Sequence, residues 1–196
     1  LTLNSKPMDG WQITWGLDAE HERFTSNQMF FDLAQASASG GLNNHKIYTT
    51  GRYPSYDITN LAAFLQSSYD INDIFTVSGG VRYQYTENRV DDFIDYTQQQ
   101  KIAAGKAISA DAIPGGSVDY DNFLFNAGLL MHITERQQAW FNFSQGVALP
   151  DPGKYYGRGI YGAAVNGHLS LTKSVNVSDS KLEGVKVDSY ELGWRF

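Results

Sequence analysis

Hydrophobic and polar side chains alternate with a period of two along several stretches of the chain. The clearest is residues 75–89, where one face carries aromatic, aliphatic and glycine positions and the other carries mainly small polar ones. Such alternation places the two sets on opposite sides of a pleated strand. It lasts for about ten residues and ends in tyrosines, longer than most soluble strands. The pattern predicts a strand that crosses a bilayer obliquely, between lipid and a wet lumen.

Five further segments share this alternation, so we expect six strands in all. They are residues 11–24, 60–69, 122–133, 139–146 and 189–196, and residues 1–4 would be the end of an earlier strand. A helix would also fit residues 61–69, but the β-branched and aromatic enrichment elsewhere favours strands throughout. In the fourth strand the apolar face consists of Phe123, Phe125, Ala127, Leu129, Met131 and Ile133. The sequence therefore predicts an all-β fold of antiparallel, membrane-spanning strands.

The connections between these segments alternate sharply between short and long. The tight turns are residues 6–10, 70–73 and 134–137. The long links are residues 25–59, 90–121 and 147–188. Loops beyond about 15 residues are uncommon in compact soluble domains. Outer-membrane barrels have short periplasmic turns and long extracellular loops, so we expect all three long links on the extracellular side.

A soluble β-sandwich with a few long loops is the alternative fold. Its outer faces would carry Lys and Glu at alternate strand positions. Here the non-aromatic faces carry mainly Asn, Gln, Ser, Thr and Gly, with few charges. Small polar residues fit a lumen packed against another polar body better than an open surface, so we favour the barrel.

Composition excludes several classes of protein. The chain has 196 residues, no cysteine and a net charge of −6. Without cysteine there is no thiol catalysis, disulfide framework or Cys-based zinc site, and the acidic balance argues against nucleic-acid binding. No run of 18 apolar residues exists that could form a transmembrane helix. No signal peptide or initiating Met is present, which indicates a piece of a longer protein.

Three segments carry motifs whose order and spacing are more specific than any motif alone. The first is Ala63-Phe-Leu-Gln-Ser-Ser-Tyr-Asp-Ile, which leads through a turn to Gly79-Gly-Val-Arg-Tyr. The second is Ala139-Trp-Phe-Asn-Phe-Ser-Gln-Gly followed by Leu149-Pro-Asp-Pro, and the third is Ser189-Tyr-Glu-Leu-Gly-Trp-Arg. Together they resemble the TonB-dependent outer-membrane receptors that import ferric siderophores. The family commonly has Gly-Phe where this chain has Gly146-Val147, which leaves the subfamily open.

The resemblance implies a bacterial outer-membrane barrel of about 22 strands, filled by a plug and coupled to TonB through an N-terminal box. Six strands cannot close a barrel, since about eight is the smallest number. We therefore expect residues 1–196 to be a partial barrel with no plug domain. Phe196 ends an alternation of aromatic residues that is typical of the last strand of a barrel. In the family that the chain resembles, however, the Ser189 motif belongs to a strand in the middle of the barrel. We therefore expect Phe196 to be a boundary within the barrel and not its natural end.

The implied function is energy-coupled uptake of a ferric siderophore without an enzymatic step. Iron would enter only as siderophore-bound cargo, and no cofactor is expected. The implied partners are the ferric siderophore, the TonB complex through the missing N-terminal part, and outer-membrane lipid. Another scarce cargo, haem or cobalamin, stays open, as does a surface adhesin or bacteriocin-binding barrel.

Two of the long links combine aromatic residues with cations. Aromatic faces stack on flat ligands, and guanidinium groups pair with anionic oxygens. Ferric siderophores commonly present both features, and the loops of this family bind them. We therefore expect ligand contacts from Tyr48, Arg52, Tyr53, Tyr155, Tyr156 and Arg158. For any one of these residues, the alternative is an aromatic girdle or loop packing.

The remaining polar candidates have structural explanations. The lumen-facing charges Arg82, Glu191 and Arg195 are assigned to packing against the plug, and His132 to hydrogen bonding within the lumen. The four histidines lack a metal-ligand spacing, and no nucleophile–base set is legible, so neither a metal site nor catalysis is expected. Acidic clusters could bind calcium, although a solvated loop surface is the more common explanation. They are Asp91, Asp92 and Asp95, and Asp119 and Asp121.

Overall fold

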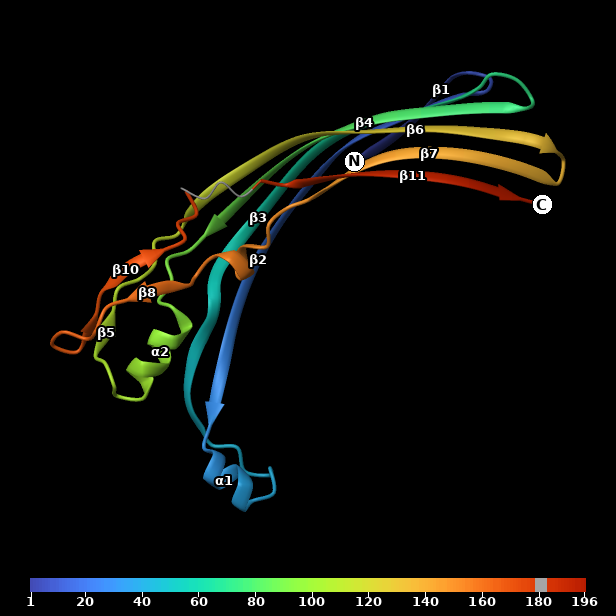
Figure 1. Ribbon diagram of the computed structural model, residues 1–196. Helices are drawn as coiled ribbons and strands as arrows, with labels where there is room; N and C mark the ends of the chain where they lie inside the picture. Colours follow the sequence, from blue (N-terminus) through green and yellow to red (C-terminus); the bar gives the residue numbers. More distant parts are fainter. Residues whose placement is uncertain (179–182) are drawn as a thin grey trace.

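The computed structural model describes residues 1–178 and 183–196 and contains one curved antiparallel sheet of seven strands (Figure 1). Its order is β1-β2-β3-β4-β6-β7-β11, with β1 and β11 as unpaired edges. The strands are β1 (Thr2–Met8), β2 (Trp11–Phe31), β3 (Lys46–Asp70), β4 (Phe75–Val90), β6 (Gly116–Thr134), β7 (Gln137–Ala148) and β11 (Val185–Arg195). A single layer with two free edges is a segment of barrel wall, and the sandwich alternative is wrong.

Tight turns join the strands at one end of the sheet. Gly10, in the β1–β2 turn, has a φ of +74°, which a residue with a side chain rarely adopts. Between β3 and β4, the Asn72 side chain accepts from the backbone amides of Ile74 and Phe75, each at 2.9 Å. Such local side-chain hydrogen bonds satisfy the backbone amides of the turn, so the chain reverses direction without a long loop. The three predicted turns are confirmed.

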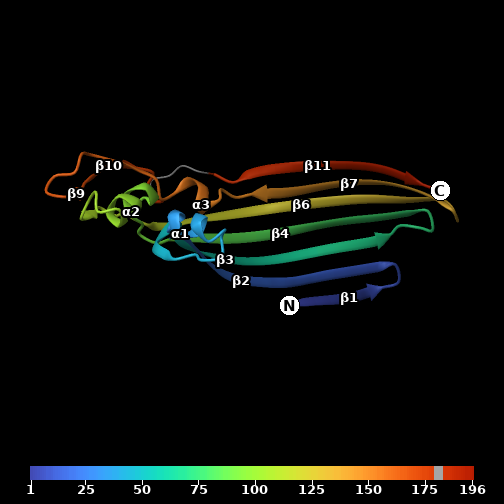
Figure 2. The same cartoon turned by 90° about the horizontal axis from the view of Figure 1, so that it is seen from below.

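The opposite end carries the long connections, which contain short elements of their own (Figure 2). The helices are α1 (Leu33–Ala38), α2 (Tyr96–Ala103) and α3 (Pro152–Tyr155). The small strands are β5 (Ser109–Ala110), β8 (Gly159–Tyr161), β9 (His168–Leu169) and β10 (Leu171–Ser174). No helix among the described residues is long and apolar enough to cross a membrane.

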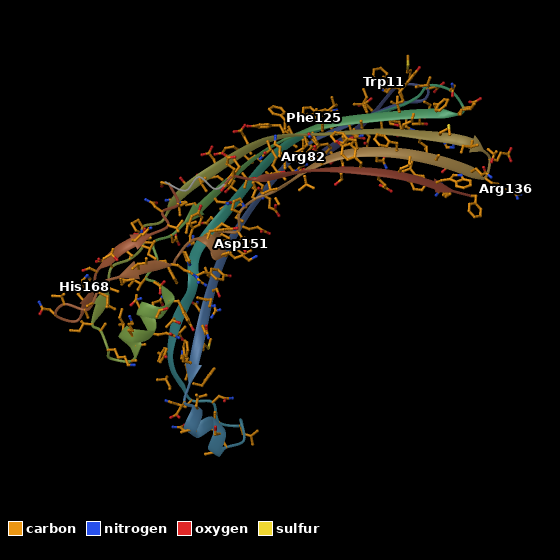
Figure 3. All side chains as sticks on the ribbon, in the orientation of Figure 1. Trp11, Arg82, Phe125, Arg136, Asp151 and His168 are labelled. Atoms are coloured by element: carbon orange, nitrogen blue, oxygen red, sulfur yellow. The ribbon has the colours of Figure 1, made fainter. Side chains whose placement is uncertain are left out.

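The two faces of the sheet differ in chemistry as the alternation predicts. Strand pairing aligns Phe125 with Val81, Leu65 and Trp15 in one row across the sheet. Phe125 lies on the convex side and Arg82 on the concave side (Figure 3). On the convex side Phe123 is 53% exposed and Phe125 is 50% exposed, because no element among the described residues covers them. An outward apolar band of this kind is the lipid-facing surface of a membrane barrel.

The apolar band ends where charged rows begin, toward the long loops. His21, Thr59, Glu87 and Asp119 are aligned across four strands. In the next outward-facing row, Arg23 pairs with Asp57 at 3.3 Å and also with Asp91 at 2.8 Å. Ionised groups are costly at bilayer depth, so these rows mark the outer limit of the lipid-facing part.

The predicted loop at residues 25–59 is mostly strand, which corrects the sequence prediction. β2 continues to Phe31 and β3 starts at Lys46, so the two strands form an arm that projects beyond the other strands (Figure 1). Pro54 and Gly51 obscured this part of β3 in the sequence. Pro54 lies where the β2–β3 register shifts and where β4 has already ended, so its missing N–H disrupts no ladder.

The main buried cluster of the chain lies at the loop end and not within the sheet. Tyr56, Val90, Tyr156 and Val177 form it, with Phe24, Tyr53, Ile58 and Val118 packed around them. Val90 ends β4 and is paired with Tyr56, which lies within β3, whereas Tyr156 and Val177 come from the connection between β7 and β11. The long loops therefore fold onto the strand ends as packed structure.

Candidate functional site

A cavity of about 450 Å³ lies between the β3 arm and the loops beside it. Three chain segments form its walls: β3, the start of α2, and the segment around α3. The lining residues are Arg52, Tyr53, Asp95, Tyr96, Thr97, Gly153, Lys154, Tyr156, Gly157 and Arg158. We call this cavity the loop pocket.

β3 contributes Arg52 to the loop pocket. The guanidinium carbon of Arg52 lies over the Tyr96 ring, and its Nη1 donates to Gln28 Oε1 at 3.1 Å. Gln28 lies on β2 and Tyr96 starts α2, so Arg52 is supported from two sides. A cation over an aromatic face is stabilised by the ring quadrupole while its remaining N–H groups stay available.

The N-terminus of α2 forms a second wall and is fixed by Asp95. This residue is only 8% exposed. Its side chain accepts from the amide of Thr97 at 2.8 Å, which caps the helix, and from the amide of Gly159 at 3.2 Å. Asp95 therefore connects α2 to the segment that carries Arg158.

α2 is also attached to β3 directly. Gln99 Oε1 accepts from the backbone amide of Gly51 at 2.8 Å, and Gln99 Nε2 donates to the carbonyl of Ile94 at 2.6 Å. The Phe93 ring packs closely on Gly51, where a Cβ would meet it at 2.7 Å. These contacts fix the helix next to Arg52.

The third wall is the short helix α3 and the turn after it. Asp151 caps α3 by accepting from the amide of Gly153 at 2.9 Å, and Lys154 Nζ lies 3.7 Å from the Asp151 carboxylate. Gly157 has a φ of +89°, and a Cβ there would overlap the Pro54 ring. Glycine at this position lets the turn pack directly on the arm.

The structure brings four of the six predicted ligand residues to the loop pocket: Arg52, Tyr53, Tyr156 and Arg158. Tyr48 lies elsewhere, stacked on Phe30 with ring centroids 4.6 Å apart. Tyr155 is on α3, 49% exposed, and does not line the pocket.

Sequence reasoning did not select Asp95, Tyr96, Thr97 or Lys154 for this site. Lys154 directly precedes Tyr155 in the sequence, and this neighbourhood to a predicted ligand residue was the signal that could have identified it. Asp95, Tyr96 and Thr97 belong to the connection between β4 and β6. Their only local signal in the sequence was an aspartate suited to the N-cap of a short helix. Their approach to Arg52 depends on how two loops fold together.

The loop pocket is positively charged in an acidic chain. Arg52, Lys154 and Arg158 line it with one lining carboxylate, Asp95, and the Asp151 carboxylate lies 3.7 Å from Lys154, whereas the whole chain has a net charge of −6. Among the described residues, Arg158 has neither an ion pair nor a hydrogen bond to its side chain. With Tyr53, Tyr96 and Tyr156 alongside, the pocket is suited to an anionic, oxygen-rich ligand with flat groups.

The lumen-facing charges have partners on the concave side. Arg82 pairs with Asp18 at 2.8 Å and lies over the Phe64 ring. Glu191 accepts from the Trp140 indole at 3.0 Å, and Arg195 donates to Gln138 Oε1 at 2.5 Å. Gln138 Nε2 in turn donates to His132 Nδ1 at 3.0 Å, so the predicted hydrogen bonding of His132 is confirmed.

The acidic residues near the loops have partners other than a metal ion. Asp91 pairs with Arg23, Asp92 accepts from the amide of Gly115 at 2.7 Å, and Asp95 caps α2. Within residues 1–178 and 183–196, no three His, Asp or Glu side chains converge in a way that could hold a metal ion. The calcium alternative therefore gains no support from the described residues.

The fold and the strand pattern define a class of protein, and comparison with known families agrees. A family model described as TonB dependent receptor-like, beta-barrel, matches residues 2–196. The chain belongs to this family of receptors, and it is a piece of a bacterial outer-membrane barrel.

Its relatives include named receptors. The chain is 91% identical to the ferric aerobactin receptor of Klebsiella pneumoniae and 85% identical to that of Escherichia coli, over all 196 residues. It is 49% identical over 193 residues to the rhizobactin receptor of Rhizobium meliloti (strain 1021). The chain spans only 27% of the length of the two aerobactin receptors and 26% of the rhizobactin receptor.

A solved structure shows the same fold at low sequence identity. The copper transporter OprC superposes with a TM-score of 0.61 at 12% identity, covering 95% of this chain and 26% of that one. At this identity the likeness concerns the arrangement of strands alone.

Proposed function

We propose that the chain is part of an outer-membrane receptor for the TonB-dependent uptake of ferric aerobactin. The observation that carries this proposal is the identity of 91% and 85%, over the whole chain, to two ferric aerobactin receptors. The 49% identical relative is named for rhizobactin, which supports the same kind of function with a different cargo.

The loop pocket supports this proposal chemically. Ferric siderophores offer clustered oxygen atoms, and guanidinium and ammonium groups bind anionic oxygens through charge-assisted hydrogen bonds. Arg52 lines the pocket from β3, and Lys154 and Arg158 line it from the third wall. On this proposal the loops capture the complex at the extracellular mouth.

Transport through the barrel depends on parts of the receptor beyond these 196 residues. The concave face carries Arg82, Glu191 and Arg195, which we assign to contacts with a plug that fills the complete barrel. Energy would come from the TonB complex through the N-terminal part. The cargo would pass without covalent change, so the receptor has no enzymatic step and iron is cargo, not a cofactor.

The experiment uses the complete receptor that contains this region. It is expressed in an iron-starved strain that lacks its own siderophores and its own aerobactin receptor, with ferric aerobactin as the iron source. Growth that depends on both the receptor and an intact TonB is expected. Growth on haem instead, a response to cobalamin, or no growth on ferric aerobactin despite normal surface expression would contradict the proposal.

A further inference from the structure

Two of the long loops form one structural unit. We call this unit the lobe and define it as residues 91–115, between β4 and β6, together with residues 149–178, between β7 and β11. Strands β5 and β9 pair in parallel, with Ser109 opposite His168 and Ala110 opposite Leu169. The amide of Ile108 also donates to the carbonyl of Gly167 at 2.7 Å. Figure 1 shows β5, α2, β8 and β10 gathered beside the β3 arm.

Asp111 makes several of the hydrogen bonds that join the two loops of the lobe. Its carboxylate accepts from the amide of Leu171 at 2.8 Å and from His168 Nε2 at 2.9 Å. Its own amide donates to the carbonyl of Leu169 at 2.9 Å, and its carbonyl accepts from the Tyr161 hydroxyl at 2.8 Å. Four contacts of one residue thus cross from the first loop of the lobe to the second.

The surroundings keep Asp111 ionised. The backbone hydrogen bond from Leu171 and then the hydrogen bond from His168 lower the pKa of its carboxyl. Nε2 of His168 donates to this carboxylate, and Nδ1 of the same ring lies 2.8 Å from the Ser109 hydroxyl, within hydrogen-bond distance. The His168 side chain is therefore fixed at both nitrogens, and both partners lie on the first loop.

A short path leads from Asp111 to the loop pocket. Leu171 and Tyr161, which both contact Asp111, are register partners in the β10–β8 pair. β8 begins at Gly159, whose amide is bound by Asp95, and Gly159 directly follows Arg158. Asp111 thus binds one end of β8, and Asp95 binds the other. These two aspartates together fix the position of Arg158, which directly precedes β8.

We propose that Asp111 is a positioning residue for the ligand site: it joins the two loops of the lobe so that Arg158 faces Arg52 across the loop pocket. This inference rests on the proposed function. Asp111 does not line the pocket, so its influence on the ligand is indirect.

The test compares Asp111→Ala with Asp111→Asn in the complete, detergent-solubilised receptor, with ferric aerobactin as the probe. Alanine removes both side-chain acceptor interactions, whereas asparagine keeps a carbonyl oxygen for Leu171 and an N–H for the histidine ring. We expect Asp111→Ala to weaken binding by about tenfold and Asp111→Asn by about threefold or less. Asp73→Ala, the same charge change in the turn at the far end of the sheet, should leave affinity unchanged.

A disulfide provides a rescue that bypasses the carboxylate. This chain has no cysteine, and Ala110 and Leu169 are register partners on the parallel strands β5 and β9; the usual strand spacing of about 4.8 Å lies within the Cα range of disulfides. In the Asp111→Ala background, the oxidised A110C/L169C pair should restore affinity to within about twofold of wild type, and reduction should remove the gain.

The outcomes separate this inference from the proposed function. Failure of the wild-type receptor to bind ferric aerobactin overturns the function. Wild-type binding with unchanged affinity in Asp111→Ala overturns the inference alone, as does weakened affinity that the oxidised pair does not restore. Loss of the barrel in Asp111→Ala would show as lost heat-modifiability on electrophoresis, and the oxidised A110C/L169C receptor with Asp111→Asn then provides the comparison.

Discussion

Arg52 and Tyr96 are far apart in the chain, yet the guanidinium carbon of Arg52 lies 5.3 Å from the centroid of the Tyr96 ring. This contact joins the β3 arm to the first residue of α2 and forms one corner of the loop pocket. The ring holds the cation in place without neutralising it, so the positive charge remains available to a ligand.

The first prediction concerns the two arginines. Replacing both Arg52 and Arg158 with alanine should weaken ferric aerobactin binding by about 2–4 kcal/mol, because each guanidinium would lose a charge-assisted pair. Calorimetry on the purified complete receptor measures the change. Arg136→Ala, at the tight turn between β6 and β7, is the control. Unchanged affinity in the double variant, with normal surface expression, would contradict the assignment of the loop pocket.

The second prediction concerns the ring beneath Arg52. Tyr96→Phe keeps an aromatic face and should bind ferric aerobactin nearly as wild type does. Tyr96→Leu removes the face and should weaken binding by about 0.5–1 kcal/mol, since an exposed cation–π contact is worth about that much. Fluorescence titration of the two variants compares them directly. Equal affinity of the leucine and phenylalanine variants would mean that the ring does not hold Arg52 for the ligand.

The third prediction tests which face meets lipid. Phe125→Arg puts a charge in the middle of the convex apolar band and should destabilise the complete receptor by about 2–4 kcal/mol in lipid vesicles. Ser144→Arg is the matched control, because Ser144 is exposed on the concave face. Urea unfolding followed by tryptophan fluorescence gives both values. A larger loss for the Ser144 variant would reverse the assignment of the faces.

The fourth prediction is a pH dependence set by Asp111. Its pKa is lowered from 3.8, first by the Leu171 amide and then by His168. A carboxyl with a lower pKa in the folded state stabilises the fold above its ordinary pKa, and this contribution is lost as the pH falls through the lower folded value. The lobe should therefore hold together from neutral pH down to about 4 and loosen below that.

An environment-sensitive dye on Ser170→Cys, between β9 and β10, would follow this transition. In the Asp111→Asn receptor the same titration should be flat over that range, because the amide does not titrate. An identical acid transition in both receptors would assign it to another group.

The fifth prediction separates backbone strain from close packing. Gly40 and Gly157 both have positive φ, but a Cβ would meet nothing within 4 Å at Gly40 and would overlap Pro54 at Gly157. Gly40→Ala should therefore cost only about 1 kcal/mol of backbone strain and leave binding intact. Gly157→Ala should also displace the third wall and weaken ferric aerobactin binding. Equal binding by the two variants would show that the Pro54 contact does not shape the pocket.

The wall of the barrel could be predicted from the sequence because its signal is local. Phe123, Phe125 and Leu129 alternate with polar positions, and lipid on one side makes that alternation hard to mistake. The arm could not be predicted in the same way. Beyond Phe24, β2 runs past the charged rows that end the apolar band, and polar residues such as Asn27 and Gln28 occupy neighbouring positions, so the alternation disappears.

The loop pocket could be predicted only in part. Arg52 and Arg158 stood out because tyrosines flank them in the chain, and the structure places both at the pocket. Tyr48 had the same local signal but stacks on Phe30 instead. Asp95 and Tyr96 gave no such signal, since their position depends on Gln99 binding Gly51, a contact between residues 48 positions apart. Contacts of this kind arise from loop packing and leave no local pattern.

The order of the strands in the wall follows the order of the chain, and each pair that a tight turn joins has its register set at that turn. An insertion or deletion at the opposite end therefore changes a loop without shifting any row of the lipid-facing band. Because two loops share the lobe through Asp111, however, they are expected to diverge together, while the tip of the arm at α1 can vary by itself. Natural sequence variation in such receptors should therefore be correlated between residues 91–115 and 149–178. Receptors that take up different cargoes should differ in both segments together.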